Sequence, residues 1–238
     1  MRIATISDIH GNLYALQTVL TDLDQQGIDQ LFCLGDLVGY GPYPNQVIAL
    51  LRERHIPTVM GNYDEGVGYD KDECGCAYVD PEMRRLGDLS LEWSKAHVTA
   101  ENKQYLQGLL SHVRFEVHGH RVLLVHGSPR RINEYVYEDR ATRSLSRIAE
   151  TADADVLVFG HTHLPYVKDV EGTLFVNDGS VGKPKDGDTR AAYAILDIGT
   201  DVQVTIRRVA YDVAAAAAAV RASELPDHFA ELLETASG

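Results

Sequence analysis

Apolar residues in the first part of the chain occur alternately in strand-like runs and at helical spacing. Residues 2–7 form a strand-like run, and over residues 13–23 leucine and valine recur every three or four positions. The unit repeats with an apolar run over 30–34 and an amphipathic segment around 47–51, which leads to a third run over 57–60. Strands that alternate with helices predict parallel strands joined by right-handed crossovers.

The pattern changes in the second half of the chain, where strands joined by tight turns predominate. Residues 66–111 carry helical patterns and predict a largely helical insertion before the next strong strand, at 122–125. A further strand is predicted over 156–159, and glycine-containing turns predict hairpins over 166–176 and 191–209. The second half is therefore expected to be richer in antiparallel pairing than the first.

The last segment, residues 211–238, predicts two short helices, the first of them a run of alanines. We expect both helices to pack on the outside of the molecule. A chain of 238 residues is long enough for one large domain with an appendage. The predicted organisation is a domain over 1–210, with the helical insertion at 66–111, followed by a C-terminal helical appendage over 211–238.

In five places, side chains that bind metals follow directly on a predicted strand. They are Asp8 and His10, Asp36, Asn62, His126, and His161 and His163. The carboxyl ends of strands in α/β sheets line the ligand crevice, so we expect these side chains to converge. Two carboxylates, one amide and four imidazoles are too many for one four-coordinate zinc, but they suit two ions that share a carboxylate. Because no thiolate stands near these ends, the set favours two divalent ions of Mn, Fe, Zn, Co or Ni.

The spacing of these residues suggests how they share an ion. If the segment around Asp8 and His10 is extended, its two-residue period places both side chains on one side of the backbone. The pair His161 and His163 repeats this spacing. Glycines adjoin most of these residues, and we expect them to permit unusual backbone angles and close approach in a crowded cluster.

Composition and charge narrow the possible partners. Hydrophobic residues make up 45% of the chain and charged residues 24%, which is typical of a folded globular protein. The net charge of −13 provides no diffuse positive field, so neither nucleic acid nor an anionic membrane is an expected partner. Three cysteines are too few for a disulfide framework, and no apolar run is long enough to span a membrane. We therefore expect a cytoplasmic protein.

The motifs that contain these residues resemble a known superfamily. DIHGN at Asp8, GDLVG at Asp36, GNYD at Asn62, HG at His126 and GHTH at His161 match, in order, the calcineurin-like metallophosphoesterases. The spacing is most similar to that of the small bacterial predicted-phosphodiesterase branch. This resemblance implies an α/β (α+β) fold, a four-layer sandwich of two mixed β-sheets flanked by helices.

The resemblance also implies a role for each residue. One metal takes Asp8, His10 and His163, the other takes Asn62, His126 and His161, and Asp36 bridges the two. Asp36, Asn62 and His126 are implied to be catalytic, and Asn12 is implied to lie close to the phosphate. The implied reaction is hydrolysis of phosphate esters, above all phosphodiesters, by a hydroxide that bridges the two divalent metals. Two such ions leave a local surplus of about one positive charge, which can attract a small phosphorylated substrate despite the overall negative charge.

One position departs from the commonest pattern of the superfamily. Tyr63 stands where a histidine usually protonates the leaving group, and the replacement candidates are Tyr63 itself, Asp64 and His97. Gly39 and Tyr40 stand where the Ser/Thr protein phosphatases and diadenosine tetraphosphate hydrolases have Asp and Arg, which makes those two activities less expected.

Two other function classes stay open beside the enzyme interpretation. A non-catalytic scaffold or interaction module is one, because the fold also resembles a retromer scaffold subunit that has lost parts of its metal set. A nuclease is the other, although the acidic composition disfavours it. The oligomeric state is not specified by the sequence.

Three further segments have simpler interpretations. Cys74 and Cys76 form a CxC pair that we interpret as an inert loop. Residues 177–180 are interpreted either as a turn or as support for the site. Lys183 and Lys185 follow in a loop, where they could reach a substrate phosphate, although exposed loop lysines usually contact only water.

Overall fold

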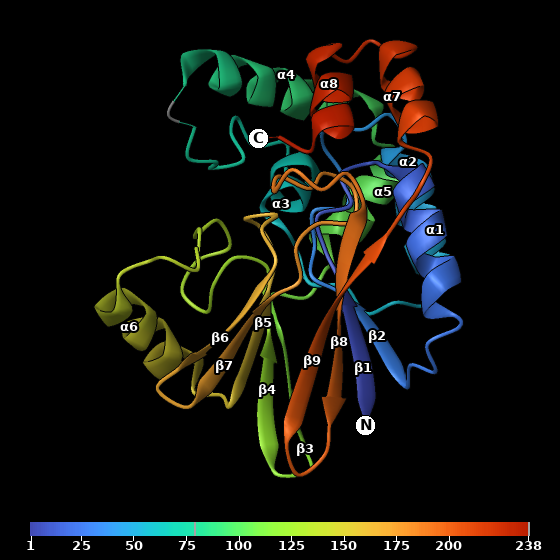
Figure 1. The fold of residues 1–238 in the computed structure, drawn as a ribbon. Coiled ribbons are helices and arrows are strands. Elements are labelled where there is room, and N and C mark those ends of the chain that lie inside the picture. The colour runs from blue at the N-terminus through green and yellow to red at the C-terminus, as the bar shows by residue number, and fades with distance from the viewer. Residues whose placement is uncertain (79, 238) are drawn as a thin grey trace.

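The computed structural model describes residues 1–78 and 80–237, and it contains two mixed β-sheets with helices on their outer faces (Figure 1). The first sheet has the order β2-β1-β8-β9. Its strands are β1 (Arg2–Ile6), β2 (Gln30–Cys33), β8 (Ala191–Ile198) and β9 (Val202–Val209). β1 and β2 are parallel, whereas β1 with β8 and β8 with β9 are antiparallel.

The second sheet has the order β3-β4-β5-β7-β6. Its strands are β3 (Val113–Val117), β4 (His120–Leu124), β5 (Val156–Phe159), β6 (Tyr166–Val170) and β7 (Thr173–Asn177). β4, β5 and β7 run parallel, and hairpins add the antiparallel strands β3 and β6 at the two edges. The predicted mixture of parallel and antiparallel pairing is confirmed.

The described residues form eight helices. They are α1 (Leu13–Leu23), α2 (Pro44–Glu53), α3 (Asn62–Gly68), α4 (Pro81–His97), α5 (Ala100–Gln107), α6 (Thr142–Ala152), α7 (Val213–Arg221) and α8 (His228–Thr235). In Figure 1, α1 and α2 lie beside the first sheet and α6 lies beside the second.

Three apolar clusters hold the layers together. The sheets pack face to face through side chains such as Ile3 and Ala194 of the first and Val122 and Val158 of the second. The outer face of the first sheet packs on α1 and α2, and the outer face of the second packs on α6. Helix, sheet, sheet and helix are therefore stacked as the predicted four-layer sandwich.

The structure differs from the predicted elements in two places. Residues 57–60 form no regular strand, and instead run beside β2 and the segment after α5 through the single bridges Cys33–Thr58 and Val59–Leu110. No element is predicted over 142–152, yet Leu145, Ile148 and Ala152 are buried at helical spacing and form the inner face of α6.

The helical insertion and the C-terminal helices meet above the carboxyl ends of the strands. The insertion begins with α3 at Asn62, four residues before the predicted boundary at 66, and continues through α4 and α5. α7 and α8 pack against Leu86 of α4 and against Tyr40, whose ring centroid lies 5.1 Å from that of Phe229. The last helices thus help to enclose the same end of the molecule (Figure 1).

We expect Phe229→Ala to lower the free energy of unfolding by about 3 kcal/mol, because it empties the buried space between α8 and Tyr40. Chemical denaturation monitored by circular dichroism measures this change. The control Leu89→Ala removes a side chain that is 41% exposed and should cost less than about 0.5 kcal/mol. Equal costs for the two variants would contradict the described packing of α8.

Candidate metal centre

The structure brings the seven predicted metal ligands together at the carboxyl ends of the strands. Each of them is buried, with at most 3% of its surface exposed. The loops that carry them are tied to one another by main-chain hydrogen bonds, such as His10 N to Asp36 O at 2.9 Å and Gly160 N to His126 O at 3.0 Å. Two groups have ligand atoms within 4.8 Å of one another, namely Asp8 with His10 and His163, and Asp36 with His126 and His161.

Asp36 stands between the two groups. Its Oδ2 lies 3.7 Å from Nε2 of His10 and 3.6 Å from Nε2 of His126. Asn62 joins the second group, because its Oδ1 lies 3.0 Å from the same nitrogen of His126. This is the arrangement expected when one carboxylate is shared by two neighbouring ions.

Main-chain carbonyls fix the tautomers of three histidines. Nδ1 of His10 lies 2.9 Å from Val38 O and Nδ1 of His126 lies 2.8 Å from Leu34 O, while Nδ1 of His163 contacts Lys183 O. A carbonyl can only accept, so each Nδ1 carries a proton and each neutral ring presents the lone pair of Nε2 to the centre. Such outer hydrogen bonds are typical of histidines that bind metals.

Lone pairs of the histidine and asparagine side chains face one another in this centre, an arrangement that a bound cation would stabilise. The Nε2 atoms of His10 and His163 are 3.3 Å apart, and Asn62 Oδ1 faces Nε2 of His126 without a proton between them. Asp8 Oδ1 and His161 Nε2 are buried without a hydrogen-bond partner in the described part of the chain. Ligands about 2.1 Å from a common ion stand roughly 3.0–3.4 Å apart, so the residues present fit divalent metal ions.

Burial also sets the protonation of the site. It lowers the pKa of His10 and His161 well below the ordinary value and that of His163 to about 4, so these imidazoles are neutral at pH 7. Burial is the largest influence on Asp8 and opposes its ionisation, but the interactions with His163, His126 and His10 together outweigh it and hold the pKa of Asp8 below the usual range. Burial, followed by the charge of Asp8, raises the pKa of Asp36. A divalent cation would favour the ionised form of both carboxyl groups.

The backbone at the ligands is left-handed, not extended. Asp8 and His10 have φ of 51° and 49°, and His161 and His163 have φ of 64° and 61°. The expectation of an extended Asp8–His10 segment is therefore wrong, although both side chains still reach one group. Asp36 shares this conformation, with φ of 54°. Non-glycine residues in this region cost about 1–3 kcal/mol each, and such strain is concentrated at functional sites.

Two glycines permit the close approach that the sequence suggests. A Cβ at Gly61 would lie 2.1 Å from Oδ1 of Asp36, and one at Gly160 would lie 2.4 Å from both Asp8 Oδ2 and Ser7 Oγ. These distances are shorter than any atomic contact allows, so the loops could not pack as they do with any larger residue.

The three candidate proton donors are all placed unfavourably. Tyr63 is 1% exposed and its hydroxyl is 3.1 Å from that of Tyr78, and burial raises its pKa. Asp64 is fully buried and accepts from the main-chain N–H groups of Asp36, Leu37 and Gly61 at 2.8–3.0 Å. His97 is exposed and stacks on Trp93. Asp64 instead holds the loops of Asp36 and Asn62 together, a positioning role that sequence reasoning missed.

Asn12 is placed beside His10, but its side chain is already engaged. Its Oδ1 caps α1 by accepting from Ala15 N at 3.1 Å, and its Nδ2 donates to Gly182 O at 2.9 Å and to Tyr211 Oη at 3.2 Å. Contact with a phosphate, which the resemblance implies for Asn12, stays a prediction.

Residues 177–180 form a supporting layer behind the ligands. Asn177 donates to Gly160 O at 2.8 Å, and Ser180 donates to Asp8 O at 2.7 Å. Ser7 Oγ lies 2.7 Å from Asp8 Oδ2 and 2.6 Å from Asp178 Oδ1. A hydroxyl has one proton, so if Ser7 donates to Asp8, Asp178 must be protonated and donate to Ser7. Accordingly, burial raises the pKa of Asp178 to about 8.

Several neighbours of the centre carry little signal in the sequence. Asn62 Nδ2 donates to Cys74 O at 3.0 Å and contacts Cys76 Sγ at 3.2 Å, so the CxC loop orients the amide. Lys183 is only 4% exposed, which contradicts its interpretation as an exposed loop lysine. The ring of Tyr135 lies 4.1 Å from that of His161. Their positions depend on tertiary contacts between distant segments.

Comparisons with known proteins agree with this centre. Residues 1–201 match the family model described as the calcineurin-like phosphoesterase superfamily domain. An uncharacterized protein of Methanocaldococcus jannaschii is 34% identical over 97% of this chain and 96% of its own length. Phosphodiesterase YfcE of Escherichia coli is 29% identical over 83% of this chain and 88% of its own. The crystal structure of a metallophosphoesterase from Sphaerobacter thermophilus covers 99% of both chains at 34% identity, with a TM-score of 0.78.

In the described ranges 1–78 and 80–237, no helix combines the length and the apolar character that crossing a bilayer requires.

Gly160→Ala should weaken Mn²⁺ binding at least about tenfold, because the added methyl group displaces Asp8. Titration calorimetry on the metal-free protein measures this change. Gly199→Ala is the control, since its Cβ would meet its nearest atom at 3.8 Å. Unchanged affinity in Gly160→Ala would contradict the described packing of these loops.

Asp178→Asn should stabilise the metal-free protein increasingly as the pH rises. The folded state keeps Asp178 protonated up to about pH 8, whereas the unfolded state releases the proton near pH 3.8, so wild-type stability falls between these values. Asparagine can donate to Ser7 without this dependence. Thermal unfolding from pH 5 to pH 9 in the presence of chelator should show a difference in Tm that grows up to about pH 8 and then levels off. A constant difference would show that Asp178 is ionised in the folded protein.

Proposed function

The chain belongs to the calcineurin-like phosphoesterase superfamily, and on this premise we propose that it hydrolyses phosphodiesters at a centre of two divalent metal ions. The observation that carries this proposal is the position of Asp36, whose Oδ2 lies at nearly equal distances from His10 and His126. Diester specificity is supported by the likeness to phosphodiesterase YfcE of Escherichia coli.

In this proposal each ion has its own ligands. Asp8, His10 and His163 would hold one ion, Asn62, His126 and His161 would hold the other, and Asp36 would contact both. When bound, two divalent ions lower the pKa of a water molecule between them and neutralise the non-bridging oxygens of a phosphate.

The residues around the ions would control charge and orientation. Asn62 is a neutral ligand, and its hydrogen bond to Cys74 O turns its oxygen toward His126. With only Asp8 and Asp36 as charged ligands and one hydroxide, the centre keeps a surplus of about one positive charge. Such a surplus attracts the phosphate of a small substrate, whereas the net charge of −13 disfavours a nucleic acid.

The placement of the candidate acids bears on the range of substrates. The Tyr63 hydroxyl is engaged with Tyr78, Asp64 accepts main-chain hydrogen bonds, and His97 is exposed on α4. A positioned acid usually accelerates departure of an alkoxide by about 10²- to 10⁴-fold. We therefore propose that the enzyme prefers esters whose leaving groups are stable anions, such as p-nitrophenolate.

The purified protein should hydrolyse bis(p-nitrophenyl) phosphate when Mn²⁺ is supplied. Asp36→Asn should lower kcat/KM at least about 100-fold, because it removes the carboxylate shared by the two ions. The visible absorbance of the released p-nitrophenolate follows the reaction. Metal analysis should give about two ions per wild-type chain and fewer in the variant.

The exposed residue Asp72 provides the matched control, and Asp72→Asn should leave both the rate and the metal content unchanged. Equal turnover by wild type and Asp36→Asn, or no turnover by either, would defeat the proposal. In the latter case a metal-binding scaffold would be the better interpretation. Digestion of single-stranded DNA or RNA in a gel assay would instead indicate a nuclease.

A further inference from the structure

A cavity of about 300 Å³ borders the metal centre, and its walls come from segments far apart in the sequence. The insertion contributes Tyr78 and Met83, and the loop after β7 contributes Lys183 and Lys185. Thr162, which stands between two of the metal ligands, also lines the cavity. A molecule held at the metal centre could therefore extend into this space.

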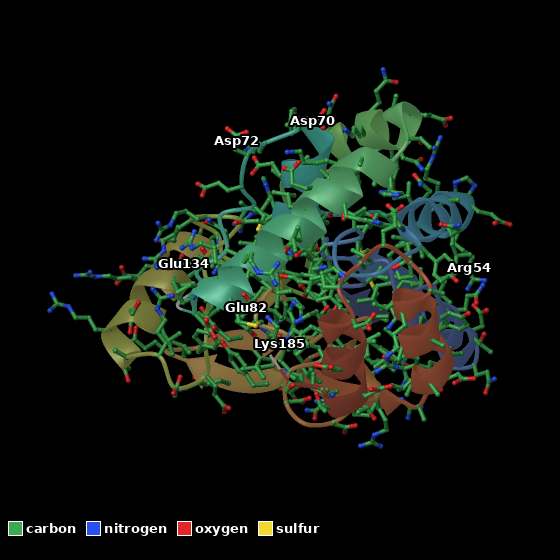
Figure 2. The ribbon with its side chains drawn as sticks, turned by 90° about the horizontal axis from the view of Figure 1, so that it is seen from above. Arg54, Asp70, Asp72, Glu82, Glu134 and Lys185 are labelled. Atoms are coloured by element: carbon green, nitrogen blue, oxygen red, sulfur yellow. The ribbon has the colours of Figure 1, made fainter. Side chains whose placement is uncertain are left out.

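Two lysines give the cavity a positive wall. Nζ of Lys183 lies 4.8 Å from the centroid of the Tyr40 ring, and that ring packs edge-on against His10, 4.9 Å between centroids. Viewed from above, Lys185 lies between α4 and α8 (Figure 2). In the described ranges, neither ammonium group makes an ion pair or hydrogen bond with another residue of the chain.

The acidic residues nearest to these lysines have other partners. Asp186 pairs with Arg208, and Asp188 pairs with Arg190. Asp80, the carboxylate among the lining residues, caps α4 by accepting from Glu82 N at 2.9 Å. Thus both lysines line the cavity, while Asp186 and Asp188 are paired with arginines and Asp80 on the cavity wall is engaged as a helix cap.

An anion in the cavity would offset the cost of burying these two charges. An ammonium group taken out of water without a partner is strongly destabilised. Lys183 is buried and Lys185 is partly buried, and no carboxylate of the described residues lies within ion-pair distance of either ammonium group, so an anion in the cavity would be their direct partner.

We propose that Lys183 and Lys185 bind a second phosphate group of the substrate, beside the phosphoester that is cleaved. This inference rests on the proposed function. The metal centre has a surplus of about one positive charge, and the two ammonium groups raise the local surplus to about three. A diester phosphate carries about one negative charge and a terminal phosphate about two more, so a substrate with both would balance the site.

Two substrates that differ by one phosphate test this inference. The first is the p-nitrophenyl ester of thymidine 5′-monophosphate, and the second is the same diester with an additional 3′-phosphate. Wild type should hydrolyse the second with a kcat/KM at least about tenfold higher, mainly through a lower KM, because charge-assisted hydrogen bonds improve binding. Equal values for the two substrates would overturn the inference.

Variants of Lys185 test whether the preference comes from the cavity. Lys185→Met should reduce it to less than about twofold, and Lys185→Arg should retain most of it. Lys168→Met is the control, because Nζ of Lys168 donates to Glu138 O on the exposed side of β6. This control should keep the wild-type preference.

The outcomes separate this inference from the proposed function. If wild type hydrolyses the plain diester but shows no preference, or if Lys185→Met keeps the preference, the second phosphate site is wrong while diester hydrolysis stands. If wild type hydrolyses neither substrate, the proposed function fails and the inference fails with it.

Discussion

The structure depends on holding seven electron-pair donors against one another in a space from which water is largely excluded. Lone pairs of His10 and His163 face each other, as do those of Asn62 and His126, and two carboxylates share the same enclosure. These groups repel one another in a medium of low dielectric, and only a positive charge makes their arrangement favourable. The fold must therefore hold the ligands in place by other means, and its two-sheet core supplies the rigid base for this.

The means are main-chain hydrogen bonds and donors outside the ligand set. Carbonyl groups of Leu34 and Val38 fix two histidine rings, and Asp64 binds the loops that carry Asp36 and Asn62. Because these partners come from the segment after β2 and from the start of α3, His10, His126 and Asp36 are each held by a different segment from their own. The backbone is left-handed and strained at five of the candidate ligands, namely Asp8, His10, Asp36, His161 and His163. This conformation persists because the surrounding hydrogen bonds hold it in place.

The sequence predicted which seven side chains gather in one place, because they follow successive strands and the carboxyl ends of those strands meet at one edge of a sheet. The periodicity of apolar residues predicted most of the elements, and the resemblance to the superfamily implied the two mixed sheets. Sequence reasoning did not predict the left-handed conformation at Asp8 and His10, since many residue types can adopt it when neighbouring hydrogen bonds enforce it. It also missed α6, although the apolar residues of this helix recur at helical spacing. The burial of Lys183 was missed because it depends on contact with Tyr40, more than a hundred residues away in the chain.

The cavity in which we propose that substrate is recognised is built from other parts of the chain than the candidate metal ligands. The ligands follow strands of the central sheets, whereas the cavity beside them is bounded by the insertion and by the loop after β7. Tyr63 connects the two regions, because its ring packs 5.5 Å from His10 while its hydroxyl meets Tyr78 in the cavity wall. A histidine at position 63 could not fill this space as Tyr63 does, since the Tyr63 ring also packs against Gly39. The departure from the commonest motif therefore joins the cavity wall to the same core that positions the candidate metal ligands.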